Sequence, residues 1–164
     1  MLSGKIKITW TKQDYENLVY KKHENPARGA TYVWKDEEQL KASNLENNVS
    51  HAYEIPDSIK QIVENFGLKK VSLAIHKYDP GQILPWHKDL YATYKKFNNV
   101  KENETVVRII VFLHDSEPGH QLWIENKFCT GKMGSYFGWE NDTMHMAANL
   151  GLVPRYNLQI TGVK

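Results

Sequence analysis

The second half of the chain is a succession of short apolar segments separated by turn residues, and this pattern restricts the fold more than any other feature. The segments are rich in β-branched and aromatic residues, and Gly, Pro, Asn and Asp stand between them. The predicted strands are residues 71–78, 105–114, 121–124, 132–137, 143–147 and 155–161. Many short strands of this kind favour a closed all-β architecture, so we predict a mainly β (α+β) protein with a jelly-roll core.

The first 70 residues contain the clearest helix, which we predict over residues 57–66. Asp57 is the expected N-cap and Gly67 the expected terminator. The apolar residues fall at helical spacing, at Ile59, Ile62, Val63 and Phe66. Further elements are predicted as a strand over residues 5–10, a helix within residues 11–20 and a charged helix over residues 35–42. We expect these N-terminal helices to pack on one sheet.

The length of 164 residues suits one domain with a sizeable core. We therefore assign residues 1–164 to a single domain, with residues 1–70 as N-terminal support and residues 71–163 as the jelly-roll core. The 21 Lys and Arg residues nearly balance the 19 Asp and Glu residues, and a net charge of +2 argues against a nucleic-acid partner.

No apolar run approaches the roughly 18–20 residues of a membrane span. Residues 1–5 lack the apolar core of a secretion signal. The single cysteine, Cys129, rules out an intramolecular disulfide framework and fits a reducing compartment. We expect a cytoplasmic protein without a membrane partner, and the sequence leaves its oligomeric state open.

His87 and Asp89 carry the strongest chemical signal in the chain. On an extended backbone, side chains two residues apart point the same way, and the preceding Pro80-Gly81 pair marks a turn into a strand. His145 offers a third ligand far downstream. Two imidazoles and one carboxylate that leave coordination positions open form the facial arrangement of non-haem Fe(II) oxygenases.

With these residues in place, the sequence resembles the Fe(II)/2-oxoglutarate-dependent oxygenases, especially the short branch similar to prolyl 4-hydroxylases. The resemblance covers residues 71–163 and implies a double-stranded β-helix. It rests on Tyr78-x-Pro80-Gly81, Pro85-Trp86-His87-x-Asp89, Phe112-Leu113-His114-Asp115, a Gly119-containing turn into Leu122-Trp123-Ile124, His145, and Arg155-Tyr156.

The resemblance implies a role for six residues. Fe(II) is expected at His87, Asp89 and His145, which are the catalytic and metal-binding set. Arg155, ten residues after the distal histidine, is expected to bind the C5 carboxylate of 2-oxoglutarate, which suits the planar fork of a guanidinium. Asn157 is expected to support that carboxylate, and Tyr78 to lie near the cofactors, although a core tyrosine fits position 78 equally well.

The resemblance also implies the reaction. We expect a dioxygenase that uses O2 and 2-oxoglutarate, with ascorbate as a further candidate cofactor, and releases succinate and CO2. Its substrate would be a peptide or protein side chain or a small molecule. Prolyl 4-hydroxylases commonly carry Tyr, Arg and Trp where this chain has Leu84, Thr105 and Thr161, so proline is not implied as the target.

Two other classes of function stay open. A cupin-like metal-dependent barrel, such as a lyase, hydrolase or isomerase, can also use two histidines and a carboxylate, but it has no need of Arg155. A non-catalytic ligand-binding barrel is the second alternative. Residues 90–104, polar and rich in lysine, are predicted as a loop beside the site, either a lid over substrate or a solvated connection.

Overall fold

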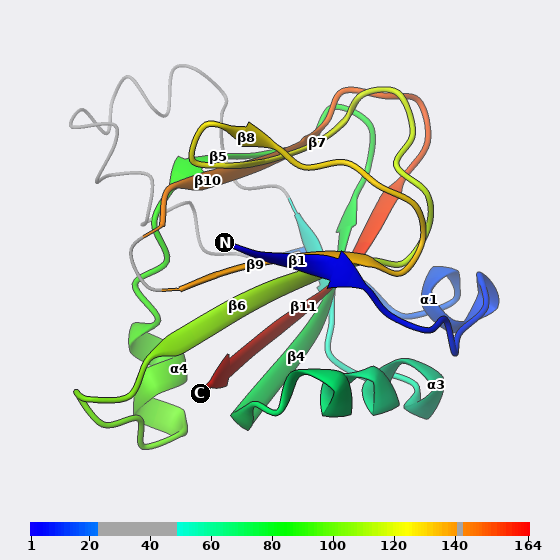
Figure 1. Ribbon diagram of the computed structural model, residues 1–164. Helices are drawn as coiled ribbons and strands as arrows, with labels where there is room; N and C mark the ends of the chain where they lie inside the picture. Colours follow the sequence, from blue (N-terminus) through cyan, green and yellow to red (C-terminus); the bar gives the residue numbers. More distant parts are fainter. Residues whose placement is uncertain (23–48, 141–142) are drawn as a thin grey trace.

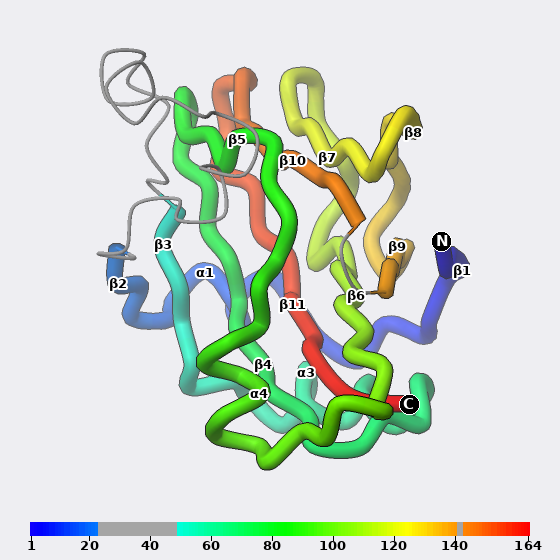
Figure 2. Tube along the Cα trace, turned by 90° about the vertical axis from the view of Figure 1, so that its left-hand side faces the viewer, coloured from blue at the N-terminus to red at the C-terminus, as the bar shows by residue number. Residues whose placement is uncertain are grey.

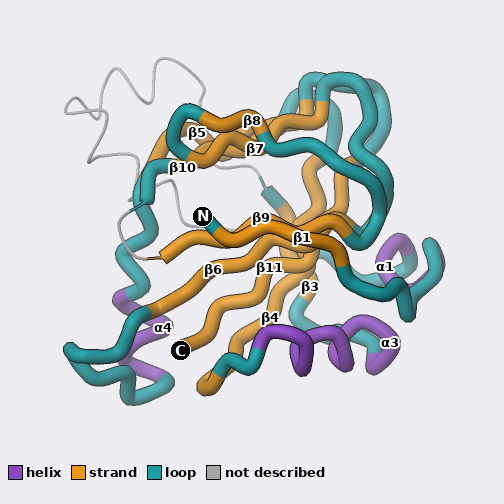
Figure 3. Tube along the Cα trace, viewed as in Figure 1, coloured by secondary structure: helices purple, strands orange, loops and turns teal. Residues whose placement is uncertain are grey.

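The computed structural model describes residues 1–22, 49–140 and 143–164. The predicted helix over residues 35–42 lies outside these described residues. Strands dominate the rest and form two antiparallel sheets, one above the other (Figures 1 and 3). The prediction of a mainly β fold is therefore confirmed.

The larger sheet has seven strands and the smaller sheet has four. The order in the larger sheet is β1 (Leu2–Lys5), β9 (Ser135–Glu140), β6 (Val106–Phe112), β11 (Arg155–Val163), β4 (Lys69–Tyr78), β3 (Ser50–Ala52) and β2 (Lys21–Lys22). The order in the smaller sheet is β5 (Ile83–His87), β10 (His145–Asn149), β7 (His120–Ile124) and β8 (Lys127–Phe128). From β4 onward the chain crosses back and forth between the sheets, which is the winding of a double-stranded β-helix. Figure 2 shows β11 between β4 and β6.

Strand alternation gives the larger sheet two different buried faces. On β6, Val107, Ile109 and Val111 point to the outer face, where they join a cluster that includes Ile75 of β4 and Leu158 of β11. The residues between them point toward the smaller sheet, and these are Arg108, Ile110 and Phe112. A run that is apolar on both faces is expected for a strand with layers on both sides. Arg108 is the one charge in that run, and it faces the interior of the barrel.

Short helices cover the outer face of the larger sheet (Figure 1). The predicted helix over residues 57–66 is present as α3 (Asp57–Lys60) followed by a 3-10 segment, η2 (Gln61–Phe66). Ile59 and Ile62 are buried against the sheet, as the spacing predicted. Gly67 ends the helix in the left-handed conformation at φ 57°. Asp57 is not the N-cap, because Pro56 takes that position with its extended backbone.

Three local predictions differ from the structure. The first strand is β1, residues 2–5, instead of the predicted residues 5–10. Ile6 and Trp10 are buried as an inward-facing strand pattern would have them, but they follow the strand. Trp10 is held by a hydrogen bond from Nε1 to Leu113 O (2.9 Å) instead of by strand pairing. The helix within residues 11–20 is reduced to α1 (Gln13–Glu16). The predicted loop over residues 90–104 contains α4 (Ala92–Phe97). No helix in the described part of the chain has the length and apolar character needed to cross a bilayer.

Candidate metal centre

His87, Asp89 and His145 meet at one end of the smaller sheet. His87 is the last residue of β5 and His145 the first residue of β10, and the antiparallel register places these two opposite each other. Asp89 follows β5 by two residues. One ligand atom from each of the three side chains lies within 4.8 Å of the other two. The group can therefore hold a metal ion, and two strand ends set its geometry.

Both imidazoles are oriented with the same nitrogen toward the centre. His87 Nδ1 lies 2.7 Å from Pro85 O, and His145 Nδ1 lies 3.0 Å from Thr143 O. A carbonyl oxygen only accepts, so each Nδ1 carries the proton and donates it. Each Nε2 is left with its lone pair directed toward Asp89, at 3.8 Å from Oδ1 for His87 and 3.5 Å from Oδ2 for His145. This tautomer is the one that ligates a metal through Nε2.

The two oxygens of Asp89 have different surroundings. Oδ1 accepts a hydrogen bond from Arg108 Nη1 at 3.1 Å, whereas Oδ2 is buried and has no hydrogen-bond partner among the described residues. A buried, unpaired carboxylate oxygen is costly, and beside two imidazole lone pairs a cation would satisfy it. Oδ2 is thus the oxygen available to a metal.

The protonation states also suit a metal. Burial lowers the pKa of His145 from 6.5 to about 3 and lowers that of His87 as well. For Asp89, burial alone would raise the pKa, but the charge of Arg108 and the neighbouring imidazoles lower it. At neutral pH the set is two neutral histidines and one carboxylate, and these are the forms in which such groups bind metals. The residues therefore fit a divalent ion such as Fe(II).

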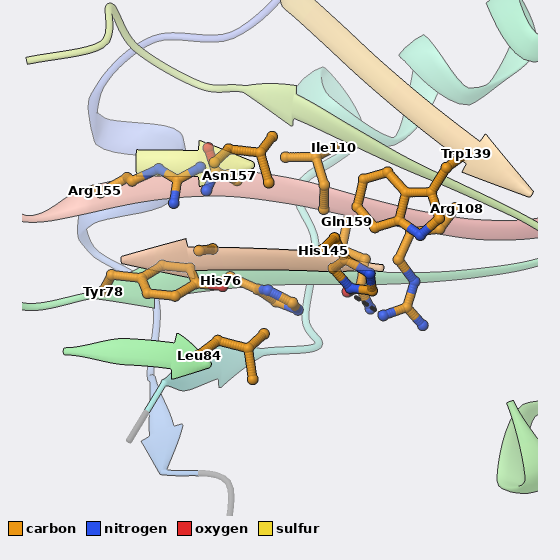
Figure 4. A pocket seen from close by; sticks show the side chains of 12 residues that line it. His76, Tyr78, Leu84, Arg108, Ile110, Trp139, His145, Arg155, Asn157 and Gln159 are labelled. Atoms are coloured by element: carbon orange, nitrogen blue, oxygen red, sulfur yellow. Dashed lines mark hydrogen bonds between the residues drawn. The ribbon is translucent and has the colours of Figure 1, made fainter. Parts of the chain in front are cut away.

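A narrow pocket runs between the sheets from the metal centre into the barrel (Figure 4). His145, Arg108 and Trp139 lie at one end of it, and Arg155 and Asn157 lie at the other. The strands explain this placement, since Arg155, Asn157 and Gln159 alternate along β11 and all face the interior. Tyr78 from β4 also lines the wall.

Arg155 is a buried cation with no counter-ion among the described residues. Its side chain lies over the rings of Tyr78 and Phe112, at 5.2 and 5.8 Å from their centroids. No carboxylate in the described part of the chain is paired with it. Burial lowers the pKa of Arg155 from 12.5 to about 10, and the neighbouring ionisable groups that oppose this change are Tyr78 and Cys129. A charge held this way in the interior calls for an anion.

The hydrogen bonds of Arg155 leave part of its fork free. Nη1 donates to Gln121 O at 2.6 Å, across to the smaller sheet. The orientation that satisfies the Asn157 amide places its oxygen 3.3 Å from both Nε and Nη2. These bonds use three of the five N–H groups of Arg155. One N–H stays free on Nη1 and one on Nη2, and this pair can bind a carboxylate end-on. Asn157 contacts Arg155 directly, and its contribution to carboxylate binding stays a prediction. Burial raises the pKa of Tyr78 to about 12, so its hydroxyl stays protonated beside the cation.

Sequence patterns did not identify Arg108, Gln159 and Trp139 as residues of the site. Arg108 Nη1 also donates to Gln159 Oε1 at 2.8 Å, so this arginine links β11 to the ligand Asp89. The ring of Trp139 lies beside that of His145, with 4.4 Å between centroids. One signal was present, because Arg108 is the single charge within an apolar strand. Its pairing with a residue 19 positions away has no signature in local spacing.

Comparison with known proteins supports the fold. No protein-family model matches the sequence, and none of the curated proteins matches it. Among solved structures, a prolyl-4-hydroxylase from Pseudomonas putida is similar over 89% of this chain and 91% of its own, with a TM-score of 0.56 and 13% identity. KdgF from Halomonas sp. has a TM-score of 0.45 at 12% identity, over 71% of this chain and 81% of its own.

A predicted oxalate decarboxylase from Thermotoga maritima has a TM-score of 0.42 at 19% identity, again over 71% of this chain and 81% of its own. At these identities the likeness concerns the fold alone. The chain thus has a double-stranded β-helix fold that a prolyl hydroxylase shares, with a His, Asp and His group that can bind a metal.

Proposed function

We propose that the protein is an Fe(II)- and 2-oxoglutarate-dependent dioxygenase that hydroxylates a peptide side chain or a small molecule. The observation that carries the proposal is the uncompensated Arg155, buried in the same pocket as the metal ligand His145. A dicarboxylate can meet both ends of this pocket, one carboxylate at the arginine and the other end at the metal centre. The resemblance of the sequence to this family and the fold shared with a prolyl-4-hydroxylase agree with the proposal.

Each residue has a distinct task in this scheme. His87, Asp89 and His145 hold the ion, with Nδ1 protons fixed on backbone carbonyls so that Nε2 faces it. Arg155 binds the distal carboxylate of 2-oxoglutarate through its two free N–H groups, while Asn157 keeps the guanidinium in plane. A preformed fork costs little ordering when ligand binds.

The apolar wall between these two ends excludes water. Leu84, Ile110, Leu122 and Ala147 line the pocket from both sheets. In such surroundings the Arg155 charge is little screened, which strengthens its attraction for a carboxylate. When bound, iron with open coordination positions supplies the redox chemistry that couples decarboxylation of 2-oxoglutarate by O2 to hydroxylation of a substrate C–H bond.

A cupin-like metal enzyme that acts without 2-oxoglutarate is the competing function, and Arg155 separates the two. Such an enzyme gains nothing from a buried cation at the end of the pocket away from the metal centre. In the proposed dioxygenase, Arg155→Gln abolishes 2-oxoglutarate binding and leaves the metal ligands untouched, whereas in the competing enzyme it leaves the activity unchanged.

The test is an anaerobic titration of the purified protein with Fe(II) and then 2-oxoglutarate, followed by visible absorption. We expect a weak charge-transfer band that needs both additions, is lost in His145→Ala through loss of iron, and is lost in Arg155→Gln through loss of 2-oxoglutarate. Lys132→Gln, which removes a cation that is 77% exposed, is the matched control and keeps the band. No band in the native protein, together with no heat of 2-oxoglutarate binding in calorimetry, would refute the proposal.

A further inference from the structure

Three buried side chains with hydrogen-bond donors lie beside the metal ligands, and they are Tyr91, Arg108 and Trp139. Arg108 Nε–H makes no hydrogen bond within the described residues, whereas the Tyr91 hydroxyl interacts with Asp89 and with Trp139. Tyr91 and Trp139 are only 8% and 3% exposed, so solvent does not readily compensate them. Buried donors are almost always paired in folded proteins, so the unpaired Arg108 Nε–H calls for an acceptor.

One edge of the Arg108 guanidinium makes no hydrogen bond to any residue that the structure describes. Both bonds it makes to side chains come from Nη1, to Asp89 Oδ1 and to Gln159 Oε1. The ring of Tyr91 lies against the guanidinium, 5.0 Å from the centroid, and helps to hold it in place. The edge formed by Nε and Nη2 makes no hydrogen bond within the described residues. That edge is a two-point fork that matches a carboxylate.

Arg108 and Trp139 line the end of the pocket nearest the metal centre, and Tyr91 stands outside that lining. Arg108 and Trp139 flank His145 there (Figure 4). Trp139 also lines a surface groove together with Ile124, Thr143 and the acidic residues Glu125 and Glu140, so the same side chain borders both the pocket and the outside. The Arg108 side chain keeps 16% of its surface exposed.

The charges of the site favour an anion as well. Asp89, Arg108 and Arg155 are the charged side chains at the pocket and the metal centre in the described part of the chain, and together they contribute +1. If the proposed function holds, a divalent ion and the dianion of 2-oxoglutarate cancel each other, and the loaded site keeps that +1. A singly charged anion neutralises it in an interior where an uncompensated charge is costly.

We propose that Tyr91, Arg108 and Trp139 form a carboxylate-binding subsite, and that the primary substrate carries a carboxylate that this subsite holds beside the metal centre. The substrate-class part of this inference rests on the proposed dioxygenase function. The Arg108 fork receives the two carboxylate oxygens, and the Trp139 and Tyr91 donors complete their hydrogen bonds. The subsite is separate from Arg155, which lies at the opposite end of the pocket.

Fluorine NMR with trifluoroacetate as the probe tests the subsite, with trifluoroethanol as the uncharged counterpart. The protein is examined metal-free, with Zn(II), and with Zn(II) and saturating 2-oxoglutarate. We expect saturable line broadening of trifluoroacetate and none of trifluoroethanol. Trp139→Phe and Tyr91→Phe each remove one polar group and keep the ring, and each weakens binding several-fold. Arg108→Gln weakens it at least about tenfold, as expected for hydrogen bonds to a charged group.

Lys95→Gln is the control for overall charge, because it removes an exposed cation of α4 and leaves the pocket intact. Equal broadening in the native protein, Trp139→Phe and Arg108→Gln overturns the subsite. Failure of 2-oxoglutarate to bind is a different result, since it refutes the dioxygenase while Arg108-dependent broadening in the Zn(II) protein still supports the subsite.

Displacement of the bound trifluoroacetate identifies the source of the carboxylate. N-acetylglycine offers a terminal carboxylate, and an N-acetylated, C-amidated Gly-Glu-Gly peptide offers a side-chain carboxylate. Displacement by N-acetylglycine alone indicates a small or terminal acid, and displacement by the peptide indicates an acidic residue of a polypeptide. Displacement by neither compound overturns the assignment of a carboxylate substrate.

Discussion

Replacing Arg155 by Met is expected to stabilise the ligand-free protein while it destroys the site for 2-oxoglutarate. The pKa of Arg155 falls from 12.5 to about 10 because the cation is buried. At about 1.4 kcal/mol for each tenfold change in proton affinity, holding this charge inside costs on the order of 3 kcal/mol. Met fills a similar volume without the charge, and such replacements of buried ionic groups are often stabilising.

Part of that gain is lost with the bonds that Arg155 makes. Its hydrogen bond to Gln121 O and its contacts with Asn157 disappear, at about 1 kcal/mol each. We therefore expect Arg155→Met to raise the free energy of unfolding of the metal-free protein by about 1 kcal/mol. Urea unfolding followed by circular dichroism measures this change, and Lys132→Met, at an exposed position, is the matched control with no expected effect.

The same variant should no longer respond to ligand. With Zn(II) bound, 2-oxoglutarate at 100 times its dissociation constant stabilises the native protein by about 2.7 kcal/mol, which raises Tm by roughly 5–10 °C for a chain of this size. Arg155→Met should lose that rise, and Arg155→Lys, which keeps the charge without the fork, should keep a small part of it. An Arg155→Met protein that is less stable than native by more than about 1 kcal/mol, or that keeps the full rise in Tm, would refute the reasoning.

Two further predictions concern stability. Burial lowers the pKa of four histidines, which are His87, His114, His120 and His145. Because these pKa values lie below those in the unfolded chain, the unfolded chain binds more protons once the pH falls below about 6.5, and stability is lost as the pH drops. The urea midpoint of the metal-free protein should fall between pH 7.5 and pH 5, less steeply in His114→Gln/His120→Gln; an unchanged midpoint would contradict this. At Gly119, with φ +91°, an added Cβ would lie 2.2 Å from Gly151 N, whereas at Gly67, with φ +57°, it would meet nothing within 4 Å. Gly119→Ala should cost at least about 3 kcal/mol and Gly67→Ala about 1–2 kcal/mol in the same assay, and equal costs would show that the steric account is wrong.

The sequence allowed the fold class to be predicted because its main signals are periodic. Alternation along residues 71–161 identified six strands near their observed positions, and helical spacing located Ile59 and Ile62 on the buried face. β1 was placed wrongly for a physical reason. It is an edge strand whose four residues are all exposed, so no burial pattern marks it, and pairing with β9 about 130 residues later defines it.

In the candidate site, local spacing predicted some of the residues, whereas contacts between distant parts of the sequence were not predictable. The two-residue spacing of His87 and Asp89 predicts that their side chains point the same way, and in the structure His87 Nε2 lies 3.8 Å from Asp89 Oδ1. Arg155 and Asn157 share a face of β11 for the same reason. The bond from Arg108 to Asp89 depends on how β6 packs across the barrel from the end of β5, and no local pattern in one sequence encodes that distance.

The central position of β11 has a consequence for biosynthesis. β4 and β6 do not pair with each other; each pairs with β11, which lies between them. On a ribosome that adds about 5–20 residues per second, several seconds pass between the synthesis of residue 78 and that of residue 163. During that interval β4 and β6 each have an edge without its partner strand, and such edges can associate with other chains. Chaperone binding to the nascent chain should therefore be greatest in this window and end when residues 155–163 insert, the same event that brings Arg155 into the barrel.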